Sequence, residues 1–166
     1  MRVVNNIHTQ AGVTLLDVLV ALIISVIVAV IAIPNYAQLN TSLERMNVRK
    51  TVLQDLRRAQ AETVTHGCRG IFEIAVNKKA YSFGCDFLPY DTESPPSMDV
   101  LKFSRTLPNN FYIESDSSVI FNSKGQITDE IGFIDSRTIS LSDNSSGPLE
   151  VYATGVVAGT GVFEFN

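Results

Sequence analysis

The chain has 166 residues, with 13 lysines and arginines against 17 aspartates and glutamates, which gives a formal net charge of −4. This acidic balance argues against nucleic-acid binding as the main function, because phosphate contacts need clustered basic side chains. The length suits one anchor helix and one small globular domain.

An apolar run from Val13 to Ile33 follows a short leader, residues 1–12, whose only charged side chain is Arg2. At about 1.5 Å per residue the run is about 30 Å long, enough to cross a bilayer, and the basic leader favours the cytoplasmic side. Asp17 stands inside the run. A carboxylate near the centre of a membrane helix costs roughly 2.5–3.5 kcal/mol, somewhat less toward its end, so Asp17 needs a partner.

Two ordinary interpretations compete for this segment. A secretory signal peptide has an apolar stretch of about 7–15 residues before a small-residue cleavage site, here Ala32 or Ala37, but the run is longer and contains an acid. A plain single-span anchor explains the length but explains neither Gly12 nor Asp17.

Gly12, Val13, Asp17 and Pro34 together closely resemble the type IV pilin signature, which prepilins share with the pseudopilins of type II secretion. The resemblance implies that a prepilin peptidase cuts after Gly12 and that Val13 becomes the N-methylated mature N-terminus. It also implies that Asp17, at the fifth mature position, pairs with the terminal amine of a neighbouring subunit. Val13 and Asp17 stand where the family commonly has Phe and Glu, and Pro34 stands at the twenty-second mature position, where many pilins carry a proline.

Pro34 removes one helical hydrogen bond, so we expect a kink or break there at the outer membrane surface, or simply the end of the span. Apolar residues then recur at spacings of mostly three or four, which predicts an amphipathic helix over residues 34–66 that ends before Gly67. Its apolar face should pack on the head domain. The residues assigned to this face are Tyr36, Leu39, Leu43, Met46, Leu53, Leu56 and Val64.

Basic residues on the same helix allow two interpretations. They could form a DNA-contacting stripe, but they do not share one face and acids interleave them. A solvated face, or charge pairing between subunits, is favoured. The residues are Arg45, Arg49, Lys50, Arg57 and Arg58.

Residues 67–166 are predicted to form a β-rich globular head. Cys68 and Cys85 flank a predicted hairpin, with strands 71–76 and 80–85 and a turn at 77–79. A disulfide is expected because the topology places the head outside the cytoplasm. A thiol nucleophile near His66 is the disfavoured alternative, and zinc would need further ligands in recognisable spacing.

Further short strands follow, separated by turn-forming residues at 123–125 and 143–148 and by a long proline-containing loop at 86–99. The predicted strands are 101–106, 110–115, 119–122, 132–134, 137–141, 150–153 and 162–165.

The head resembles the GspH/FimT group, which contains minor pseudopilin H of type II secretion and the FimT/FimU-type minor pilins. Residues 55–62 with His66-Gly67, and residues 120–125, carry this looser resemblance. It implies an α+β pilin-like fold, in which a long N-terminal transmembrane and amphipathic helix packs on an antiparallel head. Some FimT-type pilins contact DNA through an Arg-bearing C-terminal segment, whereas residues 159–166 contain no Arg or Lys.

The expected function is therefore that of a minor pilin or pseudopilin in a type II secretion pseudopilus or a type IV pilus. The chain would be a single-pass protein of the bacterial inner membrane, with its head in the periplasm or in an extracellular filament. Its partners would be other pilin-type subunits, the assembly machinery and prepilin peptidase. DNA capture by a competence pilus is the alternative. No catalytic set, nucleotide loop or calcium spacing is recognisable, so neither an enzyme nor a cofactor is expected.

Overall fold

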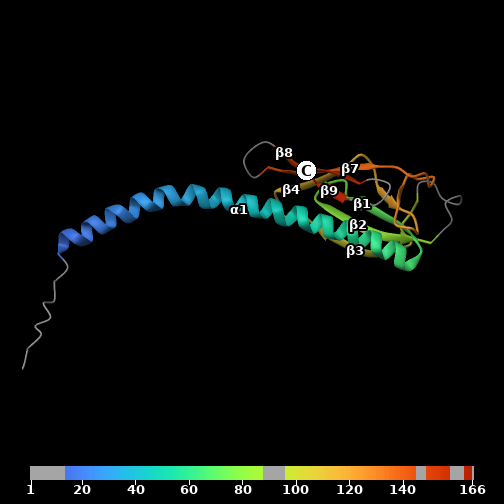
Figure 1. Cartoon of the computed structure of the whole chain (residues 1–166), viewed down its shortest axis with the longest axis horizontal. Helices are drawn as coiled ribbons and strands as arrows, with labels where there is room; N and C mark the ends of the chain where they lie inside the picture. Colours follow the sequence, from blue (N-terminus) through green and yellow to red (C-terminus); the bar gives the residue numbers. More distant parts are fainter. Residues whose placement is uncertain (1–13, 88–95, 145–148, 158–162, 166) are drawn as a thin grey trace, which may run out of the picture. The chain divides into compact units, whose positions relative to one another are not determined.

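The computed structural model describes residues 14–87, 96–144, 149–157 and 163–165, and Figure 1 shows one long helix followed by short strands. The helix is α1 (Leu15–His66). The strands of the described residues are β1 (Arg69–Ile74), β2 (Ala80–Asp86), β3 (Val100–Thr106), β4 (Phe111–Ser115), β5 (Val119–Phe121), β6 (Ile127–Thr128), β7 (Arg137–Asp143), β8 (Glu150–Val157) and β9 (Phe163–Phe165).

The chain divides into two compact units, Met1–Ser42 and Leu43–Asn166. In the first unit, large apolar side chains from Leu15 to Ile33 are exposed along the helix. Among the residues that the structure describes, no helix combines the length and apolarity that crossing a membrane requires. The helix continues through Pro34 without interruption, so the expected break is absent, and the expected kink stays a prediction.

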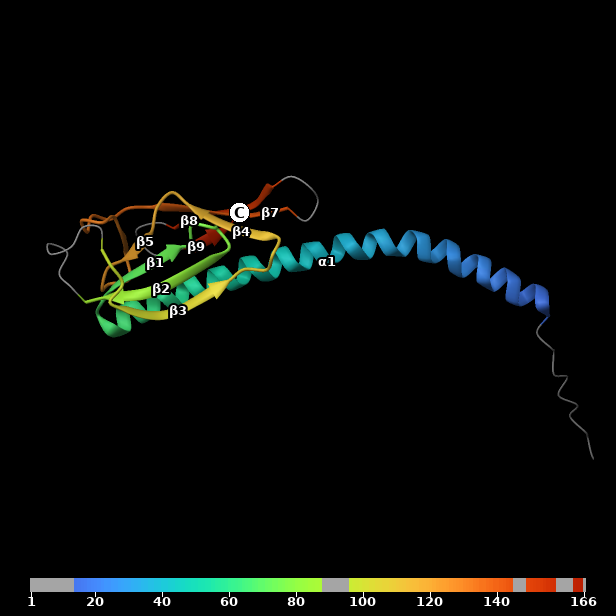
Figure 2. The same ribbon diagram turned by 180° about the vertical axis from the view of Figure 1, so that it is seen from behind.

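The second unit joins the C-terminal part of α1 to two antiparallel sheets, with strand orders β3-β2-β1-β5-β6 and β4-β7-β8-β9. Figures 1 and 2 show the strands gathered along this part of the helix. One apolar core combines helix residues such as Leu56 with Phe72 of the first sheet and Leu141 of the second. The predicted α+β class, with an N-terminal helix packed on antiparallel sheets, is confirmed.

The buried face of α1 differs from the face that the apolar spacing predicted. Leu56 is buried and Leu53 is partly buried, but Leu43, Met46 and Val64 are exposed. The buried face also includes two polar residues, Asp55 and Thr63, which a pattern of apolar residues does not predict. Both can be buried because each has a hydrogen-bond partner in the core. The members of the buried face are Val48, Val52, Asp55, Leu56, Ala59 and Thr63.

The helix ends at His66, and Gly67 adopts a positive φ of 61°, as expected for a residue that terminates a helix. Strand β1 then runs back closely against the helix. A Cβ atom at Gly70 would lie 2.0 Å from the Thr63 hydroxyl and 2.9 Å from the Phe83 ring, so only glycine fits there. This close approach places Cys68 and the start of β1 beside the end of α1.

The predicted hairpin is present, since β1 pairs with β2 and Phe72 lies opposite Phe83. The predicted strand at 132–134 is wrong. Its backbone forms a tight turn because the Asp129 side chain accepts the N–H groups of Ile131 and Phe133, and Gly132 has a φ of 94°. Only Ile134 makes a bridge, to Thr128.

Candidate functional site

The predicted assembly residue Asp17 lies in the first turn of α1, where its carboxylate binds Thr14. The Thr14 N–H and hydroxyl donate to Asp17 Oδ2 at 3.0 and 2.8 Å. In return, the Asp17 N–H approaches the Thr14 hydroxyl oxygen at 3.3 Å. This reciprocal arrangement is a capping box, with Thr14 as the N-cap and Asp17 three residues later. One chain alone therefore provides hydrogen bonds to the carboxylate.

Sequence reasoning identified Asp17 but missed Thr14. The signal was available, because a threonine followed three residues later by an acid before an apolar run is typical of a capping box. Of the other predicted residues in this segment, Gly12 and Val13 lie outside the described residues. At Pro34 the structure describes the helical backbone.

A second group of polar residues attaches the helix to the five-stranded sheet. Asp55 of α1 is buried and accepts hydrogen bonds from the Tyr81 hydroxyl at 2.7 Å and from Arg105 Nε at 2.5 Å. Burial raises the pKa of the Tyr81 hydroxyl far above its usual range, and the bond to Asp55 raises this pKa further. The hydroxyl therefore stays neutral and remains a donor to the carboxylate at physiological pH.

We expect Asp55→Ala to lower the free energy of unfolding by about 2 kcal/mol, because it leaves the buried Tyr81 hydroxyl without its acceptor. The loss from Arg105 should be smaller, since its side chain is 46% exposed and water can replace the carboxylate. Chemical denaturation of the full chain measures the change. The matched control is Arg105→Ala, for which a loss as large as that of Asp55→Ala would contradict the assignment.

A third group attaches the helix to the four-stranded sheet. Arg45 donates from Nε to the buried Asp143 carboxylate at 2.5 Å, and its guanidinium lies 5.6 Å from the centre of the Tyr152 ring. Arg49 donates to the carbonyl of Phe165 in β9. Arg58 also contacts the head, with its guanidinium 4.9 Å from the centre of the Phe103 ring of β3. Three of the five basic residues on the helix are therefore engaged within the head, which further weakens the DNA-stripe interpretation.

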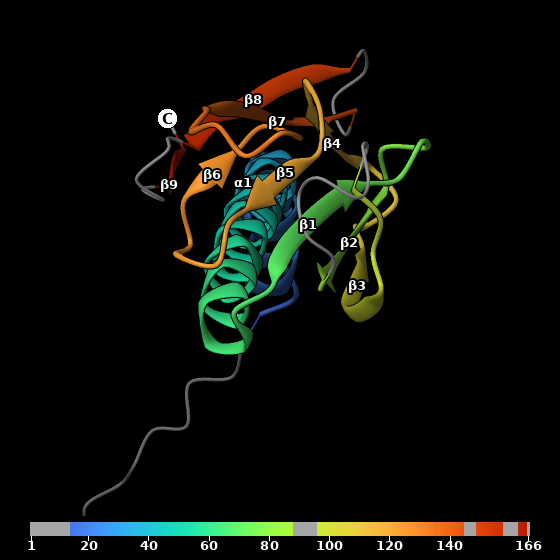
Figure 3. The same ribbon diagram turned by 90° about the vertical axis from the view of Figure 1, so that its right-hand side faces the viewer.

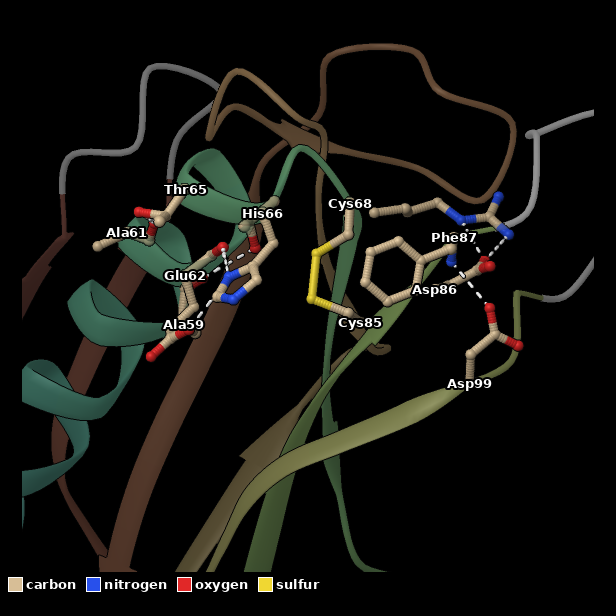
Figure 4. Close-up of a disulfide and its surroundings, with 12 residues drawn as sticks. Ala59, Ala61, Glu62, Thr65, His66, Cys68, Cys85, Asp86, Phe87 and Asp99 are labelled. Carbon is tan, nitrogen blue, oxygen red and sulfur yellow. Dashed lines mark hydrogen bonds and ion pairs between the residues drawn. A yellow bond between two sulfur atoms is a disulfide. The ribbon is translucent and has the colours of Figure 1, made fainter.

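The two cysteines form a disulfide at the end of the β1–β2 hairpin, where their Cα atoms are 5.7 Å apart (Figure 4). Both are buried, and on the next pair of residues Arg69 and Asp86 form a buried ion pair across the same two strands. His66 instead contacts Glu62, with its Nδ1 atom 3.3 Å from Oε2. The disulfide occupies both sulfurs, so the thiol-nucleophile alternative has no thiol in this structure.

Within the described residues, no group of three or more His, Cys, Asp or Glu side chains is placed to hold a metal ion. Two adjacent pockets, of about 380 and 250 Å³, share Asn47, Val48 and Pro108 as lining residues. Glu44 and Arg105 are the charged residues at their walls, one in each pocket. The buried polar groups described above, around Asp55, Asp143 and Asp86, join the helix and strands of the head to one another.

The comparisons with solved structures identify the class of fold. The minor pseudopilin EpsH from the type 2 secretion system of Vibrio cholerae matches with a TM-score of 0.51 and 15% identity, over 74% of this chain and 96% of that chain. The type IV minor pilin FimU of Pseudomonas aeruginosa matches with a TM-score of 0.51 and 12% identity, over 73% and 87%. No family model and no curated protein sequence matches the chain.

The chain therefore has a pilin-like fold, similar to that of minor pseudopilins and minor pilins. This is the fold that the N-terminal signature and the looser resemblance of the head predicted. The structural neighbours are pilin and pseudopilin subunits, which are not enzymes.

Proposed function

We propose that this protein is a minor pilin or pseudopilin, a structural subunit that assembles into a type II secretion pseudopilus or a type IV pilus. The observation that carries the proposal is a head with the fold of EpsH and FimU on a helix that begins with a pilin-like signature. A fold alone is compatible with many functions, whereas this signature indicates a specific cleavage step and a specific mode of assembly.

In this proposal, prepilin peptidase removes residues 1–12, Val13 becomes the N-methylated terminus, and the apolar segment 13–33 anchors the subunit in the bacterial inner membrane. The head then lies in the periplasm until the subunit enters a filament. The apolar character of the segment supports the anchor, since Asp17 is its only charged residue. The capping box supports storage before assembly, because Thr14 partly offsets the cost of the Asp17 carboxylate in an apolar surrounding.

Mass spectrometry of the protein purified from its native host tests the processing step. The expected chain begins at N-methylated Val13, and a Gly12→Ala variant should retain the leader. A chain that begins at Met1, or one cut after Ala37, would contradict the proposal. The subunits that co-purify with the mature protein then assign it to a secretion pseudopilus or to a pilus.

A further inference from the structure

A groove lies between the C-terminal part of α1 and the connection from β3 to β4. It consists of the two adjacent cavities of about 380 and 250 Å³, and the larger one alone has the volume of a small-ligand site. Figure 3 shows β3 and β4 on one side of α1, with β6 and β9 on the other. We name it the asparagine groove, and its defining residues are Asn47, Val48, Thr51, Pro108, Asn109 and Asn110.

One wall of the groove is a single side of the helix. Its residues are spaced by three or four positions along α1, which places their side chains next to one another. Val48 is buried, whereas Asn47 is exposed, so this wall has an apolar base and a polar rim. The residues of the wall are Glu44, Asn47, Val48 and Thr51.

The opposite wall is held in place by its backbone. The Leu107 N–H donates to the Lys79 carbonyl at 2.7 Å, and the Lys79 ammonium donates to the Asn109 carbonyl at 3.1 Å. The Asn110 carbonyl accepts the Asn144 N–H at 3.1 Å. A wall that is already ordered loses little conformational entropy when a ligand binds.

Three side-chain amides at the rim have no partner in the chain. The carboxamide groups of Asn47, Asn109 and Asn110 form no hydrogen bond with any residue that the structure describes. Each of them offers one acceptor oxygen and two N–H donors. Beneath them, Val48 and Phe111 contribute apolar surface. A few polar groups that converge over an apolar base are typical of a site that orients a small ligand.

The charges of the groove favour a neutral ligand. Arg105 is the one cation among the lining residues, and it already donates to the Asp55 carboxylate from Nε at 2.5 Å and from Nη2 at 3.3 Å. Glu44 is the one lining acid. An anionic ligand would therefore meet a carboxylate and a cation that is already engaged, which disfavours its binding.

The walls of the groove also disfavour a peptide. Peptides are commonly bound as an added strand at a sheet edge or as a helix in an apolar groove. Here the walls are a helix face and a loop whose backbone groups are engaged elsewhere, so the available polar groups are side-chain amides. The hydroxyls of a sugar match these amides, because each hydroxyl donates and accepts, and the C–H face of the ring matches the apolar base.

We propose that the asparagine groove binds a neutral saccharide, with Asn47, Asn109 and Asn110 bonded to its hydroxyls and Val48 against a C–H face of a sugar ring. This binding activity goes beyond the proposed function and does not depend on filament assembly. The same chemistry occurs in amino-sugar polymers of cell walls and in plain glucans, so two probes are needed to separate these sources.

Isothermal titration calorimetry of the full chain, in a detergent without a sugar headgroup, tests the proposal. The two probes are the β-1,4-linked tetramer of N-acetylglucosamine and cellotetraose, which differ only in their acetamido groups. At least one should bind with a dissociation constant of about 1 mM or lower. The tighter probe identifies the source as an amino-sugar polymer or a glucan, and binding of neither would overturn the proposal.

Alanine variants place the ligand in the groove. Asn47→Ala and Asn109→Ala should each weaken binding about tenfold, because each removes hydrogen bonds to the ligand. Both residues are exposed, so both variants should fold normally. The matched control is Gln38→Ala, which removes an exposed carboxamide of the same helix that lines neither cavity and should leave the affinity unchanged. Unchanged affinity in both asparagine variants would overturn the site.

Charged and peptide probes test the class of ligand. Binding of the neutral tetramers should be almost independent of salt concentration, because salt screens only charged partners. The tetramer of galacturonate should bind at least about tenfold more weakly than the better neutral tetramer, since it brings carboxylates to Glu44. Tighter binding of galacturonate, or of tetraalanine with blocked ends, than of either neutral saccharide would overturn the saccharide as the occupant.

Discussion

The Asp17→Ala variant is expected to be cleaved after residue 12 as efficiently as the wild type, but to enter filaments about tenfold less. In the proposed function, the peptidase acts before the carboxylate has a partner in the filament. Assembly, in the same proposal, buries the charged amine of a neighbouring N-terminus beside Asp17, and an unpaired buried charge is strongly destabilising. The measurement is the fraction of mature protein in sheared filaments relative to the fraction in membranes.

The capping box provides the matched control for this variant. If Asp17 acted only as a cap, Thr14→Ala would reduce filament entry as much as Asp17→Ala, since both remove the same box. We expect Thr14→Ala to cost about 1 kcal/mol of local helix stability and to reduce entry much less. Asp17→Glu, which keeps the charge, should assemble nearly normally. Equal losses for Thr14→Ala and Asp17→Ala would reject the pairing role.

Loss of the Cys68–Cys85 disulfide is expected to lower the free energy of unfolding of the head by about 3 kcal/mol. The bond joins residues separated by 17 positions, and the chain-entropy model assigns this value to a loop of that size. The double variant Cys68→Ala with Cys85→Ala, compared with the wild type in chemical denaturation, measures the change. The buried Arg69–Asp86 pair remains, so the hairpin should keep its register.

Reduction of the wild type provides a second measurement of the same quantity. A thiol reductant should lower the stability of the wild type to that of the double variant, and it should leave the double variant unchanged. Equal stability of the oxidised and reduced wild type would show that the bond makes no net contribution.

The β1–β2 hairpin was predictable from sequence because its signals are local. Two cysteines flank the strands, Asn77 and Lys78 form the turn, and the Asn77 side chain accepts the Lys79 N–H at 3.0 Å. The end of the helix was equally clear, because Gly67 supplies the positive φ that terminates it. In both cases the residues that decide the structure are neighbours in the chain.

The buried face of the helix was not predictable in the same way. The apolar spacing assigned neither Asp55 nor Thr63 to the face that packs on the head, yet both are buried. Asp55 is buried because Tyr81 and Arg105 provide donors, and Thr63 because its hydroxyl donates to the Ala59 carbonyl at 2.8 Å. Tyr81 and Arg105 lie far along the chain from Asp55, so no helical periodicity reveals them. The strand predicted at 132–134 was wrong for a related reason. The Asp129 side chain accepts the N–H groups of Ile131 and Phe133, which holds these strand-forming residues in a turn.

The separate attachment of each sheet to α1 has a mechanical consequence. Asp55 binds Tyr81 and Arg105 of the five-stranded sheet, while Arg45 binds Asp143 of the four-stranded sheet. Within the described residues, no strand of one sheet pairs with a strand of the other. A pull along the helix axis therefore loads these links together in shear, rather than opening them one after another. In a filament under tension, the head would resist removal from its helix at several points simultaneously.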